Sequence, residues 1–130
     1  MKVIITGGGG FLGSQLATKI LNKGTLAGPS GKQEPVEQMV LIDAHFPVPQ
    51  TDERVQEITG DISDRDVIES AIDGATEVSV FHLASMVSGE CEERYDDAIR
   101  VNLDGGRNVF DAARAIEGRP RVVFASSIAC

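Results

Sequence analysis

Basic residues are scarce in this chain of 130 residues: there are twelve lysines and arginines against twenty aspartates and glutamates, which gives a formal charge of −8. A protein that binds the phosphate backbone of nucleic acids needs a basic face, so the charge balance argues against such a partner. Long apolar runs are also missing, and no segment approaches the roughly 18 residues that cross a membrane. The N-terminal apolar stretch is only about four residues long and runs into glycines, so it predicts a strand and not a signal peptide.

Cysteine is limited to Cys91 and Cys130. Neither belongs to a CxxC motif or lies at zinc spacing from a histidine, so we expect inert, reduced thiols, no metal site and a cytoplasmic protein. Apolar residues make up 42% of the chain, which is enough for a hydrophobic core. The length fits one compact domain over residues 1–130.

Short apolar runs alternate with longer segments of helical periodicity along the chain. We expect strands at residues 2–6, 39–43, 54–58, 77–84 and 121–126. We expect helices at residues 11–23, 63–72 (capped by Ser63, with Asp66 at the capping-box position) and 92–116 (weakened at Gly105 and Gly106), and a loop at 25–38. Alternation of this kind is typical of βαβ units, so the predicted fold class is α/β: a Rossmann-type doubly wound parallel sheet in three αβα layers. Ligands of such sheets bind beyond the carboxyl ends of the strands.

The sequence TGGGGFLG at residues 6–13 places three glycines in the pattern G-x-x-G-x-x-G between an expected strand and an expected helix. In this context Gly7 would allow the tight turn, Gly10 would let a pyrophosphate approach the helix N-terminus, and Gly13 would let the helix pack closely. The alternative is a merely flexible glycine turn. A second glycine-rich segment, GPSGKQ at residues 28–33, lacks two defining positions of a triphosphate-binding P-loop and is predicted to be an ordinary loop.

Two aspartates lie at the ends of expected strands: Asp43 ends one of them, and Asp61 comes shortly after another. Asp43 would accept hydrogen bonds from the adenosine ribose of NAD, and the absence of arginine from LIDAHF disfavours the extra phosphate of NADP. Asp61 in GDI would accept from the adenine amino group while Ile62 packs on the ring. The alternatives are that Asp43 caps a turn and that Asp61 helps to cap the following helix. His82 is predicted to be a satisfied side chain at the end of a strand and not a catalyst.

These segments together resemble the extended short-chain dehydrogenase/reductase family, which includes nucleotide-sugar epimerases and dehydratases. The matching stretches are TGGGGFLG, LIDAH, GDISD, FHLAS, VNLDGGRNVFDAAR and VFASSIA, in the family's order. The resemblance implies a Rossmann domain that binds NAD and forms the N-terminal part of a longer oxidoreductase. It implies cofactor contacts from Gly7, Gly10, Phe11, Leu12, Gly13, Asp43, Asp61, Ile62, Leu83, Ala84, Ser85 and Asn102. Ser127 matches the family's catalytic serine.

Within the family, HLASMVSGECEERYD followed by VNLDG looks most like the D-erythronate dehydrogenases, which implies that Ser88 and Gly89 lie near a small-molecule substrate. The family's Tyr-x-x-x-Lys pair is absent, because the single tyrosine, Tyr95, is followed four positions later by Ile99. We therefore expect the cofactor-binding piece of an enzyme that moves a hydride between nicotinamide and a hydroxyl of a sugar acid, inactive by itself. The alternatives are a nucleoside-diphosphate-sugar epimerase or dehydratase, and a non-catalytic NAD-binding regulator.

A homodimer is a further expectation from the resemblance, because the family's long helix commonly pairs with its copy across a two-fold axis. In this chain the corresponding segment carries apolar Val101, Val109 and Ile116 among many charges.

Overall fold

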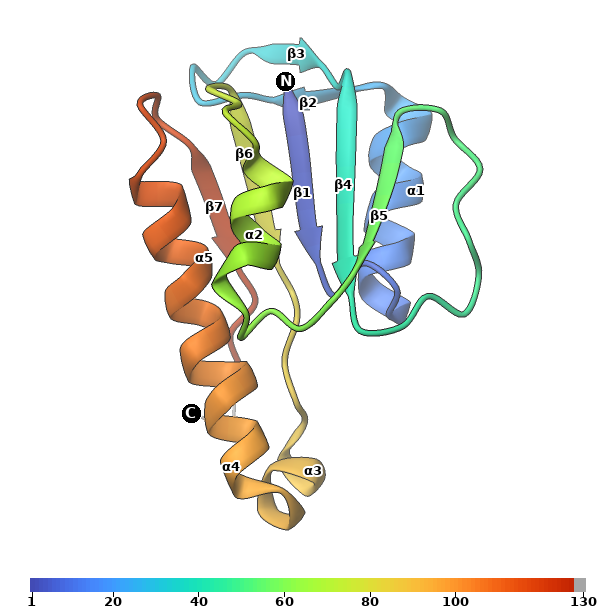
Figure 1. Cartoon of the computed structure of the whole chain (residues 1–130). Helices are drawn as coiled ribbons and strands as arrows, with labels where there is room; N and C mark the ends of the chain where they lie inside the picture. The colour runs from blue at the N-terminus through green and yellow to red at the C-terminus, as the bar shows by residue number, and fades with distance from the viewer. Residues whose placement is uncertain (128–130) are drawn as a thin grey trace.

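The computed structural model describes residues 1–127 and contains a five-stranded parallel sheet (Figure 1). The strands are β1 (Lys2–Thr6), β4 (Gln38–Asp43), β5 (Val55–Thr59), β6 (Val78–His82) and β7 (Arg121–Phe124), in the spatial order β5-β4-β1-β6-β7. The chain builds outward from β1 on one side and then crosses to the other side with β6. The switch point of the sheet therefore lies between β1 and β6, where ligands of doubly wound sheets bind.

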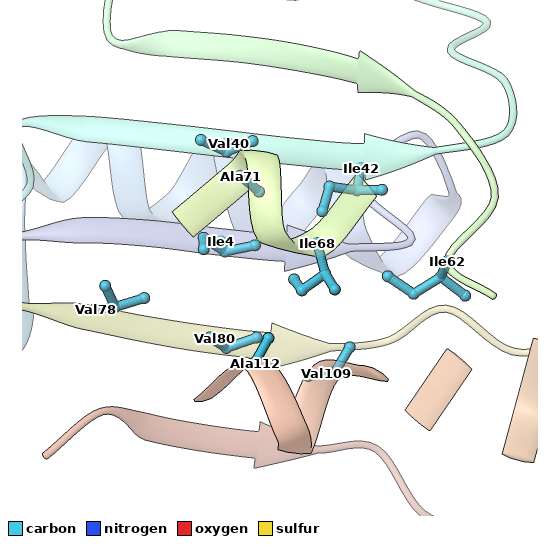
Figure 2. Packing of buried hydrophobic residues seen from close by; sticks show 10 residues of the cluster. All are labelled: Ile4, Val40, Ile42, Ile62, Ile68, Ala71, Val78, Val80, Val109 and Ala112. Carbon is cyan, nitrogen blue, oxygen red and sulfur yellow. The ribbon is translucent and has the colours of Figure 1, made fainter. Parts of the chain in front are cut away.

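Helices cover both faces of this sheet, as the alternating pattern predicts. Helix α1 (Phe11–Lys23) lies behind the sheet in Figure 1, whereas α2 (Arg65–Ile72) and α5 (Gly105–Arg114) lie in front of it. Side chains of β1 alternate between two cores: Ile4 packs under α2 and α5, and Val3 and Ile5 pack under α1. Figure 2 shows the first of these cores, with Ile68 of α2 set against the strands. The central strands are buried on both faces, which explains their unbroken apolar sequences.

The segment predicted to be a loop at residues 25–38 was assigned wrongly in part. It contains a two-stranded antiparallel hairpin, β2 (Thr25–Ala27) and β3 (Gln33–Pro35), at the amino end of the main sheet. Three-residue strands have too little periodicity to be recognised. Their pairing is a cross-strand property, which single-segment patterns do not report.

The start of α2 also differs from the prediction by one residue. Asp64, not Ser63, is the N-cap, and its carboxylate accepts from the backbone N–H of Asp66 at 3.0 Å. The Ser63 hydroxyl instead donates to Asp61 Oδ1 at 2.7 Å. Asp66 therefore takes part in the cap only through its backbone N–H, and its side chain does not complete a capping box.

The helix predicted over residues 92–116 is wrong in its start and in its weak point. A short helix, α3 (Ser88–Glu93), ends at Arg94, and a new helix begins with α4 (Tyr95–Ala98). It continues through a π-helical segment, η1 (Ile99–Asp104), directly into α5. The irregularity thus lies in η1, whereas Gly105 and Gly106 are buried and helical.

The apolar residues on which the expected homodimer depended pack against the core of this chain. Val109 is buried, and Val101 and Ile116 pack against the same core. The exposed apolar side chains of this long helix are instead Tyr95, Ile99, Leu103 and Phe110. The dimer stays a prediction.

Candidate functional site

A cleft of about 730 Å³ opens at the carboxyl ends of the strands, the lower edge of the sheet in Figure 1. Its walls come from the segments after β1, β4, β5, β6 and β7, from α3, and from the α4–η1 part of the long helix. The structure brings most of the expected cofactor residues together here. They are Gly7, Gly10, Phe11, Leu12, Gly13, Asp43, Asp61, Ile62, Leu83, Ala84 and Ser85.

The turn between β1 and α1 is fixed by backbone hydrogen bonds to the neighbouring strand. The N–H groups of Gly7 and Gly8 donate to the carbonyl oxygen of Ile42 at 2.8 and 3.1 Å. Gly7 has φ +75°, and a Cβ there would lie 3.0 Å from the backbone nitrogen of Ala84. A Cβ on Gly13 would overlap the carbonyl oxygen of Gly7. Glycine is therefore required at both positions, for the turn and for the close approach of α1.

Gly10 stands at the start of α1 and differs from those two glycines because its surroundings are open. It is the N-cap, and a glycine has no side chain with which to cap the helix. A Cβ on Gly10 would meet only the carbonyl oxygen of Gly7, at 3.4 Å. The first turn of α1 carries no acidic residue, and its free N–H groups and the positive end of the helix dipole face the cleft. These residues fit an anionic group such as a diphosphate.

Asp43 ends β4 beside this turn and holds part of it. Its Oδ2 accepts from the N–H of Gly9 at 3.0 Å, and its Oδ1 accepts from the N–H of Ala44 at 2.7 Å. An ionised carboxylate has about four lone-pair sites, so each oxygen can accept one further hydrogen bond. In this structure Asp43 caps the turn, as the alternative interpretation of the sequence predicts. Its carboxylate oxygens can still accept hydrogen bonds from a ribose hydroxyl.

Asp61 and Ile62 both line the cleft, but their side chains have other partners. Asp61 accepts from the N–H and hydroxyl of Ser63 at 2.9 and 2.7 Å through Oδ1, and from Arg100 through Oδ2. Partial burial raises the pKa of Asp61, yet the hydrogen bonds from Ser63 and the pairing with Arg100 outweigh this and lower it. The Ile62 side chain is buried in the core, so only its surface edge and backbone are available to a ring.

Thr6 and His82 form hydrogen bonds that join the ends of β1 and β6 at the switch point. The Thr6 hydroxyl oxygen accepts from the N–H groups of Leu83 and Ala84, each at 3.1 Å, and lies 2.6 Å from His82 Nδ1. Because two donors already fill the lone pairs of the hydroxyl oxygen, its proton goes to His82 Nδ1, which requires a neutral imidazole. Burial also lowers the pKa of His82. The prediction of a satisfied strand-end histidine is confirmed.

Four expected site residues lie outside the cleft lining. Both amide atoms of Asn102 bind the backbone of Met86: Oδ1 accepts from its N–H at 2.7 Å, and Nδ2 donates to its carbonyl at 3.2 Å. In this arrangement Asn102 holds the loop after β6. Ser88 and Gly89 are exposed at the start of α3, and Ser127 is exposed after β7.

Sequence reasoning missed the charged rim of the cleft, formed by Arg94, which directly precedes the long helix, and by Asp97 and Arg100 within it. The signal that would have revealed it is the spacing of alternating charges three residues apart, which places Asp97 and Arg100 on one helical face. In the part of the chain that the structure describes, no cluster of three or more histidine, cysteine or acidic side chains is suited to hold a metal ion. Within the same residues no helix has the length and hydropathy needed to cross a membrane.

The strand order and the glycine turn at the switch point define a Rossmann-type domain of the dinucleotide-binding class. The model of the NAD dependent epimerase/dehydratase family matches residues 3–130, and the chain belongs to that family. This confirms the family resemblance drawn from the sequence motifs.

Relatives and solved structures agree with this assignment. The chain is 45% identical over 129 residues to D-erythronate dehydrogenase of Cupriavidus necator, covering 99% of this chain and 39% of that protein. It is 32% identical to D-erythronate dehydrogenase of Haemophilus influenzae, covering 99% of this chain and 38% of the relative. The crystal structure of the nucleoside-diphosphate-sugar epimerase from Agrobacterium tumefaciens matches with a TM-score of 0.79 at 38% identity, over 99% of this chain and 38% of that one. This chain thus spans about two fifths of the length of these relatives.

The requirement for glycine at position 7 can be tested against Gly24, which ends α1 at nearly the same φ, +74°. At Gly24 a new Cβ would have no described atom within 4 Å, so Gly24→Ala costs only the left-handed strain, about 1–2 kcal/mol. Gly7→Ala adds crowding against Ala84 and is expected to lower the free energy of unfolding by about 2–5 kcal/mol. Chemical denaturation of both variants measures the difference, and equal losses would contradict the close contact.

The neutral state of His82 predicts a pH dependence of stability. Since the pKa of His82 is lowered in the folded chain, the unfolded chain binds the proton first as the pH falls below about 6.5. Above that pH the free energy of unfolding is therefore at its highest and does not change with the titration of His82. Below that pH it decreases, by up to about 1.4 kcal/mol per pH unit. Denaturation of His82→Gln between pH 7.5 and 5 should show a weaker dependence than the wild type. The same change at exposed His45 is the control, and an equal effect of the two would refute the assignment.

Proposed function

We propose that these 130 residues form the NAD-binding part of an oxidoreductase that transfers a hydride between nicotinamide and a hydroxyl of a sugar acid such as D-erythronate. The observation that carries the proposal is the start of α1 at Gly10, which is open to the cleft and has no acidic residue in its first turn. The identity to D-erythronate dehydrogenases supports the substrate class.

In this proposal the chain's own groups serve the diphosphate bridge and the adenosine ribose of the dinucleotide. Amides at the start of α1 hold the diphosphate, and Asp43 accepts from the hydroxyls of the adenosine ribose. A 2′-phosphate would meet the Asp43 carboxylate, and the cleft arginines, Arg94 and Arg100, are already paired with Asp97 and Asp61. These charges favour NAD over NADP. Phe11 and Leu12, which are 81% and 61% exposed at the rim, supply apolar surface that a bound ligand would cover.

Thr6 and His82 fix the backbone of Leu83 and Ala84, which forms the wall at the switch point. When bound there, NAD supplies an acceptor for a hydride at its nicotinamide ring. In this proposal Ser127 orients the oxygen of the substrate. The proton on that oxygen needs an acid/base pair, and the sequence contains no Tyr-x-x-x-Lys. Cofactor binding is therefore the step that these residues perform by themselves.

The second candidate is a nucleoside-diphosphate-sugar epimerase, which would use the same cofactor site. The match to the epimerase structure from Agrobacterium tumefaciens favours it. A regulator that binds NAD without chemistry is the third candidate. For the dehydrogenase we propose a cytoplasmic location, supported by Cys91, whose free thiol donates to the carbonyl oxygen of Met86 at 3.3 Å.

Gly10→Ala separates ligand binding from folding. Because the new Cβ has room within the chain, the free energy of unfolding should change by less than about 1 kcal/mol. The same methyl group would project toward the diphosphate, so calorimetry should show NAD binding weakened by about tenfold or more. Unchanged NAD affinity, or a wild-type chain that binds no NAD, would contradict the proposed site.

A further inference from the structure

A chain of alternating charges lines the cleft and reaches the segment after β5. Arg94 donates to Asp97 Oδ2 through Nε at 3.0 Å and Nη2 at 2.6 Å. On the other side of Asp97, Arg100 Nη2 donates to Oδ1 at 3.2 Å. Arg100 Nη1 then reaches across to Asp61 Oδ2. The long helix is thereby linked to the segment after β5, 39 residues earlier in the sequence.

Arg100 is bonded to Asp61 both directly and through the hydroxyl of Ser63. Besides the direct pairing, Arg100 Nη1 donates to the hydroxyl oxygen of Ser63 at 2.8 Å, and that hydroxyl donates to Asp61 Oδ1. The Asp61 carboxylate is thus held from both oxygens, with the guanidinium on Oδ2 and Ser63 on Oδ1. The arrangement sets the direction in which the carboxylate points, although its side chain is 43% exposed.

The Asp61 carboxylate has one lone pair left that can accept a hydrogen bond from a ligand. Two donors from Ser63 use both lone pairs of Oδ1, and Arg100 uses one lone pair of Oδ2. One acceptor site on Oδ2 is left, on a residue that lines the cleft. That site suits a single N–H donor, because a ligand atom with only lone pairs would face negative charge.

Arg100 itself begins an irregular part of the helix. Its carbonyl oxygen accepts from the N–H of Gly105, five residues later, in the π-helical segment η1. Such turns are rare within helices and are frequent at functional sites. Arg100 and Val101, both in this segment, line the cleft.

We propose that Arg100 is a positioning residue for purine recognition: it orients Asp61 so that the one open acceptor site of Oδ2 receives the exocyclic amino group of adenine. This inference rests on the proposed function, since it assigns the adenine end of the NAD site. Arg100 acts through Asp61 and needs no contact with the ligand. The competing role is a purely structural link between the helix and the segment after β5.

The test compares NAD with nicotinamide hypoxanthine dinucleotide, in which a carbonyl oxygen replaces the 6-amino group. The wild-type chain should bind NAD about tenfold more tightly than this analogue, because the carbonyl oxygen has no proton to donate. Arg100→Met keeps the length of the side chain but removes its donors, and should reduce this preference about threefold or more. Arg100→Lys keeps the charge without the fork and should give an intermediate preference, which provides a second variant if Arg100→Met fails to fold.

Arg114→Met is the matched control, since Arg114 lies outside the cleft lining and pairs with Asp111 on the same helix at 3.8 Å. Its preference for NAD should equal that of the wild type. If the wild type prefers NAD and the Arg100 variants keep the full preference, with or without a loss of stability, Arg100 is only structural and the inference is overturned. A wild type that binds both dinucleotides equally overturns it as well. A wild type that binds neither refutes the proposed function and the inference with it.

Discussion

The contact between the glycine turn and the end of β4 is the constraint on which the rest of the site depends. The carbonyl oxygen of Ile42 receives two N–H groups of the turn, and the carboxylate of Asp43 receives a third. These bonds use the amides that precede Gly10 and leave the start of α1 open to the cleft. The position of the anion site is therefore set by the neighbouring strand, and not by the flexibility of four glycines.

The long helix is bonded to two walls of the cleft, the loop after β6 and the segment after β5. Asn102 binds the loop after β6 through Met86, and Arg100 binds the segment after β5 through Asp61. These two residues are only two positions apart, in the π-helical segment. A shift of this part of the helix would thus move both walls together, which links the geometry of the two ends of the cleft.

Features carried by local pattern were predictable from the sequence. The buried strand Lys2–Thr6, the helix Phe11–Lys23 and the glycine spacing between them agree with the prediction, because burial and steric crowding act within that short segment. Features that depend on distant partners were not predictable. Whether Asp61 is open or paired depends on Arg100, 39 residues away, and the side-chain amide of Asn102 is bonded to the backbone of Met86, 16 residues away.

A titration of the ¹⁵N-labelled chain with NAD, followed by backbone amide NMR, tests the central claim most directly, since it reports on each N–H group separately. The account predicts that the largest and saturable shifts occur at residues 10–13 of the α1 start, with smaller ones at residues 83–85. Shifts centred instead on the separate hollow between the carboxyl ends of α2 and α5, lined by Ile72, Ala112 and Ile116, would contradict it, as would a spectrum that NAD leaves unchanged.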